Sequence, residues 1–258
     1  MELTWWGTAA FRIKTGNLVF LLDPYVSRNE KARPGQYLKA ENVSDGELIF
    51  LSHGHFDHIL DVPVIAQKAG SRVYCSAEAE NTLIETGLNK NRVHRVETDG
   101  YTIDFDGHQA QAFFSEHVKF DKKLLLKTLL KINIRIFRYI PLLKKFPAGQ
   151  VLSWRFSIEG KILHFFGSGG SPPEELEKLA SRTTDILLVP LQGHSNICDI
   201  ALEYVKVMQP KIVIPHHQDD FFPPISSMVD IRPFVDGVKS ECPNTKIRVL
   251  ELNETISL

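Results

Sequence analysis

The stretch LSHGHFDHILD, from Leu51 to Asp61, places three histidines and an aspartate within six consecutive positions, directly after the apolar run 48–51. A short apolar run that is followed at once by polar groups is typical of a buried strand that ends at a sheet edge. Removing an unpaired imidazole or carboxylate from water costs several kcal/mol. The cluster therefore indicates a strong compensating partner, such as a metal ion.

The spacing within this stretch favours metal binding. Gly54 allows the chain to bend sharply between two ligands. His53 and His55, two positions apart at a strand end, can project to one side, whereas Asp57 and His58 stand where the next helix begins. Neutral imidazole is the commonest ligand of zinc-like ions, and a carboxylate suits harder ions or a second site. Surface histidines in a capped loop are the alternative, but the pattern H-x-H-x-D-H favours a metal site.

Length and composition favour one large soluble domain over residues 1–258. A chain of 258 residues with 43% hydrophobic content can bury a full core. The three cysteines form no CxxC pair, which indicates neither a disulfide framework nor a thiolate metal site and fits a reducing compartment. The N-terminus lacks the pattern of a signal peptide, and no apolar run approaches the roughly 20 residues of a membrane helix. We therefore expect a cytoplasmic protein.

Strand-like and helix-like segments share the chain. The segments 3–6, 10–14 and 18–22 are separated by short turns, which predicts an antiparallel meander. Further strands are expected at 48–51, 72–75, 111–114, 151–158, 161–166, 186–189, 211–214 and 247–250, and helices at 62–69, 78–86, 172–180, 200–208 and 231–240. Strands mixed with helices predict sheets covered by helices, in an α/β (α+β) layered sandwich.

The H-x-H-x-D-H pattern after a strand resembles the signature of the metallo-β-lactamase superfamily of metal-dependent hydrolases. Within it, the opening LTWWGTAAFRIKTGNLVFLLDPY and the later VIPHHQDD are most similar to the branch containing L-ascorbate-6-phosphate lactonase and the N-acylphosphatidylethanolamine phospholipase D-like proteins. The resemblance runs from Leu3 to about Phe222, with residues 119–146 as an insertion. It implies a four-layer αββα metallo-β-lactamase-like sandwich with a metal centre at one edge of the paired sheets.

The resemblance implies a first metal site and supplies its third ligand. His53 and His55 belong to this site, together with a histidine that follows a later strand. In this chain the segment AQAFFSEHV provides that residue as His117. The implied ion is zinc or manganese.

A second site would combine Asp57 and His58 with a histidine beyond the last core strand. The segment KIVIPHHQDD offers both His216 and His217. The family's spacing of a proline, one residue and then histidine selects His217, which leaves His216 as a neighbour. The two roles can also be exchanged, since boundaries inferred from sequence slip by a residue or two.

One ligand that the family usually has is missing. A metal-bridging aspartate normally follows a strand in a Gly-Asp-Thr type of turn, but the corresponding stretch here is HFFGSGGSPPEELEKL, with Ser168 at that position. A serine hydroxyl supplies no negative charge between two close ions. We predict one ion and expect the second site to be weaker, differently composed or empty. Backbone N–H groups at Ser168 and Gly169 can instead hold a substrate anion, although a tight turn before a helix is the plain alternative.

Two more residues are candidates for roles beside the metal. His194 lies in PLQGHSNICD, a loop that borders the active site in the resembling branch, so it can contact substrate, donate a proton or replace a lost ligand. An exposed loop position is the alternative. Asp23, in LLDPY, can orient a ligand histidine through a hydrogen bond, or serve an ordinary Asp-Pro turn.

The insertion at about 119–146 is strongly basic. It contains nine basic residues and one acid, and removing it leaves 21 basic and 30 acidic residues, a formal charge of −9. Lys123, Lys127, Lys131 and Arg135 recur at steps of four among apolar residues, the pattern of an amphipathic helix. Such a helix can cover the active site, contact another copy in a homo-oligomer or lie on an anionic membrane, and we favour the first two. The acidic remainder argues against nucleic acid.

Together these features predict a metal-dependent hydrolase. An ion at the first site would lower the pKa of bound water and supply hydroxide near neutral pH. Asp57 would orient the nucleophile and relay its proton, and a second ion would stabilise the leaving oxygen. We expect a small anionic substrate with a lactone or phosphodiester bond. The alternative is a metal-binding or sensor module without turnover, which has lost the bridging aspartate.

Overall fold

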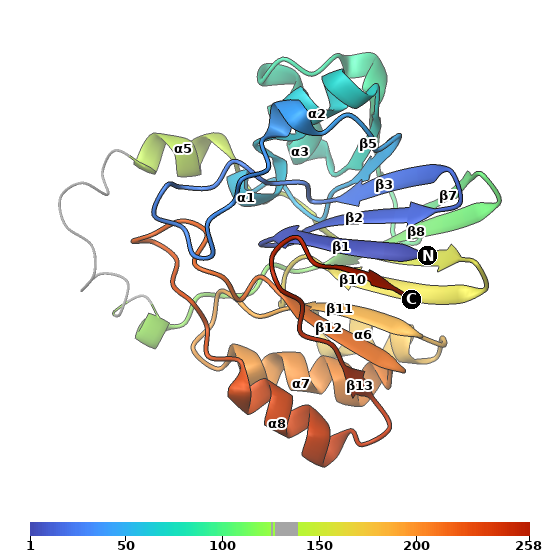
Figure 1. Cartoon of the computed structure of the whole chain (residues 1–258), viewed down its shortest axis with the longest axis vertical. Coiled ribbons are helices and arrows are strands. Elements are labelled where there is room, and N and C mark those ends of the chain that lie inside the picture. Colours follow the sequence, from blue (N-terminus) through green and yellow to red (C-terminus); the bar gives the residue numbers. More distant parts are fainter. Residues whose placement is uncertain (125, 127–138) are drawn as a thin grey trace.

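The computed structural model describes residues 1–124, 126 and 139–258. Within these residues the strands form two seven-stranded sheets, in the orders β14-β1-β2-β3-β4-β5-β6 and β13-β12-β11-β10-β9-β8-β7. Figure 1 shows α2 and α3 on one side of the paired sheets and α7 and α8 on the other. The predicted αββα sandwich is therefore confirmed.

The first sheet begins with the predicted antiparallel meander. Its strands are β1 (Glu2–Gly7), β2 (Ala10–Thr15), β3 (Leu18–Leu22), β4 (Leu48–Phe50), β5 (Arg72–Cys75), β6 (Val93–Arg95) and β14 (Thr255–Ser257). The first three pair antiparallel, β4 to β6 extend the sheet in parallel, and β14 closes the other edge. Because β3, β4 and β5 are parallel, the polar groups that follow β3 and β4 meet at one edge.

The second sheet has an antiparallel and a parallel half. Its strands are β7 (Thr102–Phe105), β8 (His108–Ser115), β9 (Val151–Ile158), β10 (Lys161–Phe166), β11 (Ile186–Pro190), β12 (Ile212–His216) and β13 (Lys246–Ile247). Strands β7 to β10 pair antiparallel, and β10 to β13 pair parallel. The strand expected at 247–250 is wrong beyond Ile247, where the chain leaves the sheet.

Helices cover both outer faces. On the side of the first sheet are α1 (Phe56–Ile59), α2 (Val62–Ala69) and α3 (Ala77–Glu85), and on the side of the second are α6 (Pro173–Ala180), α7 (Ile197–Met208) and α8 (Arg232–Glu241). The short helix α5 (Ile140–Lys145) lies beyond the strand ends, as Figure 1 shows. Two short 3-10 helices span Ala40–Asn42 and Lys90–Arg92. Helix α7 starts three residues earlier than predicted, because the apolar Ile197 packs into the second sheet's outer core.

Three apolar clusters hold the four layers together. One lies between the sheets and includes Phe20 from the first and Phe156 from the second, whose ring centroids are 5.1 Å apart. A second joins α2 and α3 to the first sheet, and a third joins α6, α7 and α8 to the second. Each fully buried Leu or Phe side chain contributes roughly 1.5–3 kcal/mol. These clusters fix the strand ends that carry the polar groups of LSHGHFDHILD.

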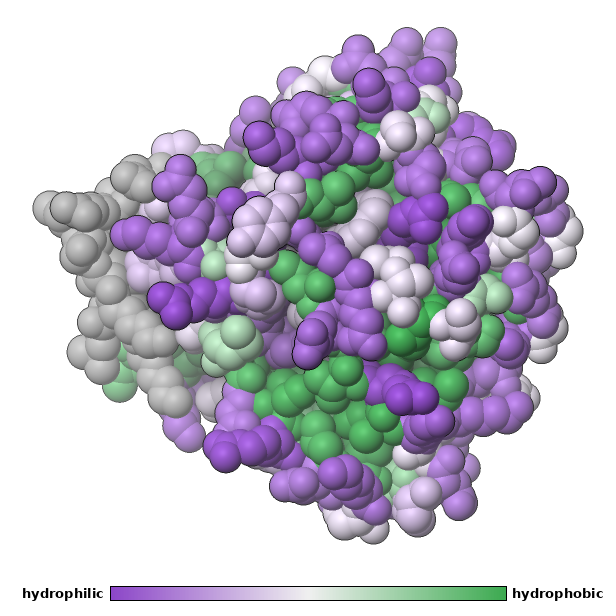
Figure 2. All heavy atoms as spheres, viewed as in Figure 1, coloured by the Kyte–Doolittle hydropathy of each residue, from purple (hydrophilic) through white to green (hydrophobic). Residues whose placement is uncertain are grey.

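The surface of the molecule is mostly hydrophilic. Hydrophilic side chains cover most of the face shown in Figure 2, with an apolar area toward the lower centre of the view. Among the described helices, none has both the length and the apolar character needed to cross a bilayer. Of the predicted basic stripe, Lys123 is exposed, whereas Lys127, Lys131 and Arg135 lie outside the described residues.

Candidate metal centre

The polar cluster lies where β4 ends at one edge of the first sheet. There the chain passes very close to residues 147–148, because Gly54 N donates a hydrogen bond to Ala148 O at 2.8 Å. A Cβ atom on Gly54 would lie 2.3 Å from the carbonyl oxygen of Pro147. The glycine is thus required by this close approach of two backbones. It is not among the residues with a positive φ, so close packing and not a left-handed backbone conformation accounts for the glycine.

Three histidines from two segments form a first triad. The ligand atoms of His53, His55 and His117 all lie within 4.8 Å of one another, and His53 Nε2 is 3.1 Å from His55 Nδ1. His117 lies two residues beyond β8. Its Nδ1 is 2.8 Å from the carbonyl oxygen of Val118. Because a carbonyl can only accept, Nδ1 carries the proton and Nε2 keeps a lone pair for an ion.

The first triad is held in the uncharged state that binds metals. Burial lowers the pKa of His53 well below its usual range, and the neighbouring imidazoles act in the same direction. Burial lowers the pKa of His55 to about 4, although Asp57 opposes the shift. Burial also lowers the pKa of His117, although its hydrogen bond to Val118 opposes this. Neutral imidazole is the ligating form, so at neutral pH these side chains need lose no proton to bind an ion.

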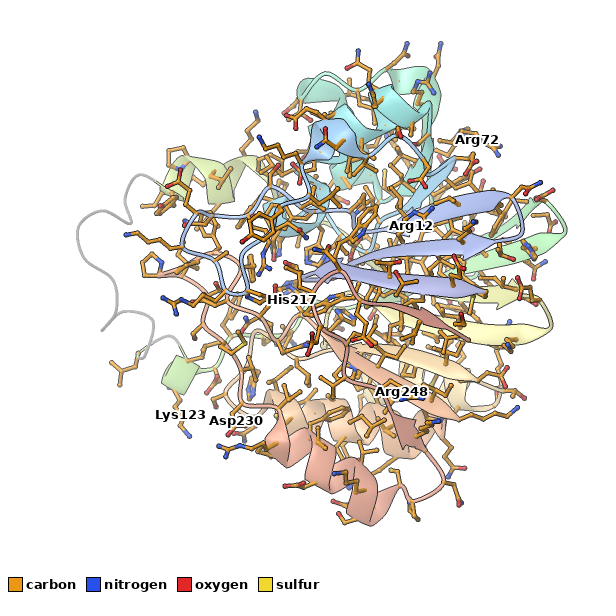
Figure 3. All side chains as sticks on the ribbon, in the orientation of Figure 1. Arg12, Arg72, Lys123, His217, Asp230 and Arg248 are labelled. Atoms are coloured by element: carbon orange, nitrogen blue, oxygen red, sulfur yellow. The ribbon has the colours of Figure 1, made fainter. Side chains whose placement is uncertain are left out.

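A second triad contains Asp57, His58 and His217, whose ligand atoms also lie within 4.8 Å of one another. Asp57 Oδ2 is 3.3 Å from His217 Nε2 and 3.7 Å from His58 Nε2. Burial opposes ionisation of Asp57, but His58 and His217 hold its pKa below the usual range. His217 adopts a left-handed φ of 63°, and its N–H donates to Thr8 O at 2.9 Å. Figure 3 shows His217 near the strand ends of the first sheet.

Asp23 lies beneath both triads and is completely buried. Its Oδ2 is 2.7 Å from His58 Nδ1, and its Oδ1 accepts from Ser52 N at 2.7 Å. Ser52 Oγ donates to the same carboxylate and lies 2.9 Å from His53 Nδ1. Burial opposes protonation of His58, but Asp23 and Asp57 raise its pKa. The sequence pointed to Asp23 but not to Ser52, whose only signal is its position before His53.

Asp23→Asn is expected to weaken zinc binding by about 10- to 100-fold. An amide would orient His58 directly, and His53 through Ser52, less firmly than the carboxylate does. Equilibrium titration of the metal-free protein with zinc measures the effect. The matched control is Asp45→Asn, which changes a carboxylate that pairs with Arg12 on the surface. Equal affinities for both variants would mean that Asp23 serves only the Asp-Pro turn.

The structure brings His217, and not His216, to the second triad. His216 is fully buried between the sheets, with its ring centroid 5.2 Å from that of Phe11 and 5.5 Å from that of Phe165. Its Nε2 lies 3.1 Å from the carbonyl oxygen of Phe166. Burial lowers the pKa of His216 well below its usual range. The exchanged assignment of these two histidines therefore has no support in the geometry.

Ser168 contacts the backbone that carries the first triad. Its Oγ accepts a hydrogen bond from Val118 N at 2.9 Å, and Ser168 lines the same pocket as both triads. Gly170 lies against His117, since a Cβ on it would be 2.3 Å from the carbonyl carbon of that histidine. Gly169 packs near Ile197 and is not among the described residues that line the pocket. The turn thus supports His117 and supplies no carboxylate to the triads.

A buried carboxyl group supports this turn from helix α6. Ser153 Oγ donates to Glu175 Oε1 at 2.9 Å, whereas Oε2 has no hydrogen-bond partner among the described residues. Ser171, on the adjacent turn, accepts from Ser115 or donates to it at 2.9 Å. Burial raises the pKa of Glu175 to about 7, although the nearby serine side chains, Ser153 among them, oppose the shift. The folded chain therefore holds a proton on Glu175 that the unfolded chain releases at lower pH.

Glu175→Gln is expected to change how stability depends on pH. Because the folded pKa of about 7 exceeds the unfolded value of 4.5, the wild-type protein loses stability as pH rises between these values. Between pH 4 and pH 8, the free energy of unfolding of the variant should therefore rise by on the order of 3 kcal/mol relative to that of the wild type. Urea unfolding at both pH values measures this, with Glu177→Gln on the exposed side of α6 as control. If wild type and Glu175→Gln differed in free energy of unfolding by the same amount at both pH values, the raised pKa of Glu175 would be contradicted.

His194 lies apart from both triads. Its Nδ1 accepts from Asn196 N at 3.0 Å, and its Nε2 is 4.0 Å from Asp121 Oδ1. Its neighbours Gln192 and Gly193 line the pocket, but His194 is not among the described lining residues. A catalytic role for His194 stays a prediction.

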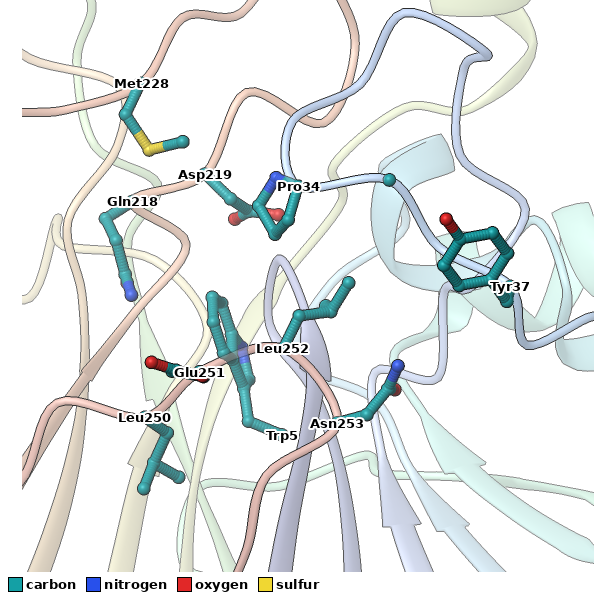
Figure 4. Close-up of a pocket in the computed structure, with 11 residues that line it drawn as sticks. Trp5, Pro34, Tyr37, Gln218, Asp219, Met228, Leu250, Glu251, Leu252 and Asn253 are labelled. Atoms are coloured by element: carbon teal, nitrogen blue, oxygen red, sulfur yellow. The ribbon is translucent and has the colours of Figure 1, made fainter.

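A pocket of about 470 Å³ contains all six residues of the two triads. A second pocket, of about 480 Å³, is shown in Figure 4 with Trp5 and Asp219 among its lining residues. Asp219 is already occupied there, since its two oxygens accept from Thr8 N and pair with Arg28. In the described part of the chain, the two triads are the groups with the composition and proximity to hold an ion. The chemistry therefore belongs to the first of these pockets.

Known proteins resemble this chain in sequence and in fold. A family model described as a beta-lactamase superfamily domain matches residues 2–217. A UPF0173 metal-dependent hydrolase of Listeria innocua is 31% identical over 229 residues, which cover 86% of each protein.

A metallo hydrolase from the hyperthermophilic archaeon Ignicoccus hospitalis has a similar structure, with a TM-score of 0.69 and 21% identity, covering 99% of this chain and 97% of its own. Isothiocyanate hydrolase from Delia radicum gut bacteria has a TM-score of 0.68 and 15% identity, covering 100% and 99%. These two structures show the fold alone, and they confirm the predicted metallo-β-lactamase-like sandwich.

Proposed function

Because the chain belongs to the UPF0173 metal-dependent hydrolases of the beta-lactamase superfamily, we propose that its two triads hydrolyse a lactone or phosphodiester bond in a small anionic substrate. One observation carries this proposal. Ligand atoms of His53, His55 and His117 lie within 4.8 Å of one another, and all three residues line one pocket. Imidazoles with one nearby carboxylate form a donor set that suits zinc or manganese.

The residues of the two triads would bind metal ions, and Asp57 would also contact the attacking water. The first triad would hold the main ion, and Asp57, His58 and His217 would hold a second one more weakly. When bound, an ion of this kind polarises a carbonyl or phosphoryl oxygen and makes water a better nucleophile near neutral pH. Asp57 is ionised at neutral pH because its pKa is held low. It can therefore accept a hydrogen bond from a water molecule in the pocket and orient it, and it would hold the proton of that water only transiently, because a carboxylate with a low pKa is a weak base.

The charge of the cluster supports an anionic substrate. Among the six residues, Asp57 alone carries a negative charge when the imidazoles are neutral. With the Asp23 carboxylate beside His58 included, one divalent ion would balance the formal charge of the cluster. The ion would then supply the local positive charge that attracts a phosphate ester or the oxyanion of lactone opening. The lactone and phosphodiester classes themselves rest on the resemblance of the opening segment and of VIPHHQDD.

Turnover of model substrates tests this function. A chromogenic phosphodiester and a simple lactone are offered to protein of known metal content. We expect hydrolysis of at least one of them, its loss on chelation and its recovery when zinc or manganese is restored. Protein that carries a full complement of metal and turns over neither compound would favour a metal-binding or sensor module instead.

A further inference from the structure

The pocket at the triads has an extended apolar wall. Several large apolar side chains line it, among them Val118, Phe120, Leu124, Leu143, Phe146 and Phe221. Most of these residues come from the two described ends of the 119–146 insertion. The insertion is therefore part of the pocket as well as a basic surface segment.

Aromatic rings of this wall lie directly beside the candidate ligands. The ring centroid of Phe120 is 6.0 Å from that of His117, and the centroid of Phe221 is 5.1 Å from that of His217. The part of a ligand next to a group bound at either triad would therefore contact an apolar surface. A substrate that ended at its reactive group would leave this surface in water.

Two residues of the wall have substantially exposed side chains. Phe120 is 54% exposed and Leu143 is 43% exposed, whereas Phe146 and Phe221 are buried. Leu143 lies on α5, a short helix at the same end of the molecule as the triads. Exposed apolar side chains that gather at a pocket mark a surface that a ligand covers. When a ligand covers these side chains, binding gains about 25 cal/mol of free energy for each Å² of apolar surface removed from water.

Basic residues are sequence neighbours of two residues of this wall. Lys123 precedes Leu124, and Lys144 and Lys145 follow Leu143, and all three lysines are exposed. Asp121, the acid of the insertion, accepts hydrogen bonds from Ser195 at 3.0 and 2.8 Å and keeps its negative charge, but the three lysines outnumber it. Positive charge therefore flanks the apolar surface, which complements an anionic amphiphile.

We propose that the substrate is an anionic amphiphile, with its reactive group at the triads and an alkyl or acyl chain of several carbons along the apolar wall. Phe120 and Leu143 then determine specificity for the chain. The identity of the reactive group rests on the proposed hydrolytic function. Binding of the chain does not, because it depends only on the wall.

Binding of unreactive homologues tests this proposal. Linear alkylphosphonates with two, four, six and eight carbons are titrated into the metal-loaded protein by calorimetry. The Kd should fall with chain length by up to about fourfold for each added CH₂ group. Leu143→Ser should flatten this dependence. Ile140→Ser, which changes an exposed residue of the same helix that does not line the pocket, should retain it.

The outcomes separate this proposal from the proposed function. A Kd independent of chain length, or equal flattening by Leu143→Ser and Ile140→Ser, would overturn the amphiphile. Binding that depends on the chain, without metal-dependent turnover of a long-chain ester, would contradict the hydrolytic function alone. Monomeric octylphosphonate and anionic phospholipid vesicles then distinguish a dissolved amphiphile from a lipid. Binding to either supports the proposal, and binding to neither overturns it.

Discussion

His55→Ala is expected to lower metal-dependent hydrolysis by about 1,000-fold, because a bound ion supplies several kcal/mol of transition-state stabilisation. His55 is only partly buried, so its loss should leave the fold intact. Its Nδ1 lies 3.1 Å from His53 Nε2, and its removal leaves the first triad with two ligands. The measurements are kcat/KM and the metal content of each chain.

A histidine remote from the triads provides the control. His94 on β6 stacks on Tyr74 at a centroid distance of 5.0 Å and lies outside both triads. His94→Ala should retain metal and activity. If His55→Ala bound metal and hydrolysed substrate as well as His94→Ala does, the first triad would not be the metal site.

Ser168→Asp is expected to raise the affinity for a second ion by on the order of 100-fold, since a carboxylate a few ångströms from an ion contributes several kcal/mol at the effective dielectric of a protein. An aspartate has two oxygens, so one can keep the hydrogen bond from Val118 N and the other can face the triads. We expect wild-type protein to bind one ion tightly and this variant to bind two. Calorimetric titration with zinc gives both stoichiometries.

Charge can be separated from shape at the same position. Ser168→Asn has nearly the same size as Ser168→Asp and can still accept from Val118, but it carries no charge. Its stoichiometry should remain that of the wild-type protein. Two tightly bound ions in the wild type, or in the asparagine variant, would show that the missing carboxylate does not limit the second site.

Local patterns predicted the parts of the site that are close in sequence. His53, His55, Asp57 and His58 follow from one six-residue stretch, because a strand end and a helix start fix their directions. His117 could be placed only through the family resemblance, since a lone histidine has no local signature. The choice of His217 over His216 was likewise made from the family's spacing, and the structure accounts for it through the left-handed turn and the bond to Thr8.

Other features depend on how distant segments approach one another. Strands β6 and β7 are short and partly polar, so no apolar run predicted them. Gly54 was expected to allow a bend, whereas the approach of Pro147 is what excludes a larger residue. The apolar wall formed by Phe120 and Phe221 could not be predicted, because these residues are about one hundred positions apart and meet only in the folded chain.

The most direct test of the account is a thermal-unfolding titration of metal-free protein with zinc and with manganese, alongside direct counting of bound ions. We predict one tightly bound ion per chain. At an ion concentration of about 100 times the Kd the midpoint should rise by roughly 5–10 °C. A double variant, His53→Ala with His117→Ala, should bind no ion and show no rise in its unfolding midpoint. No bound ion and no rise with either metal, or the same rise in the double variant, would contradict the assignment of His53, His55 and His117 as the metal site.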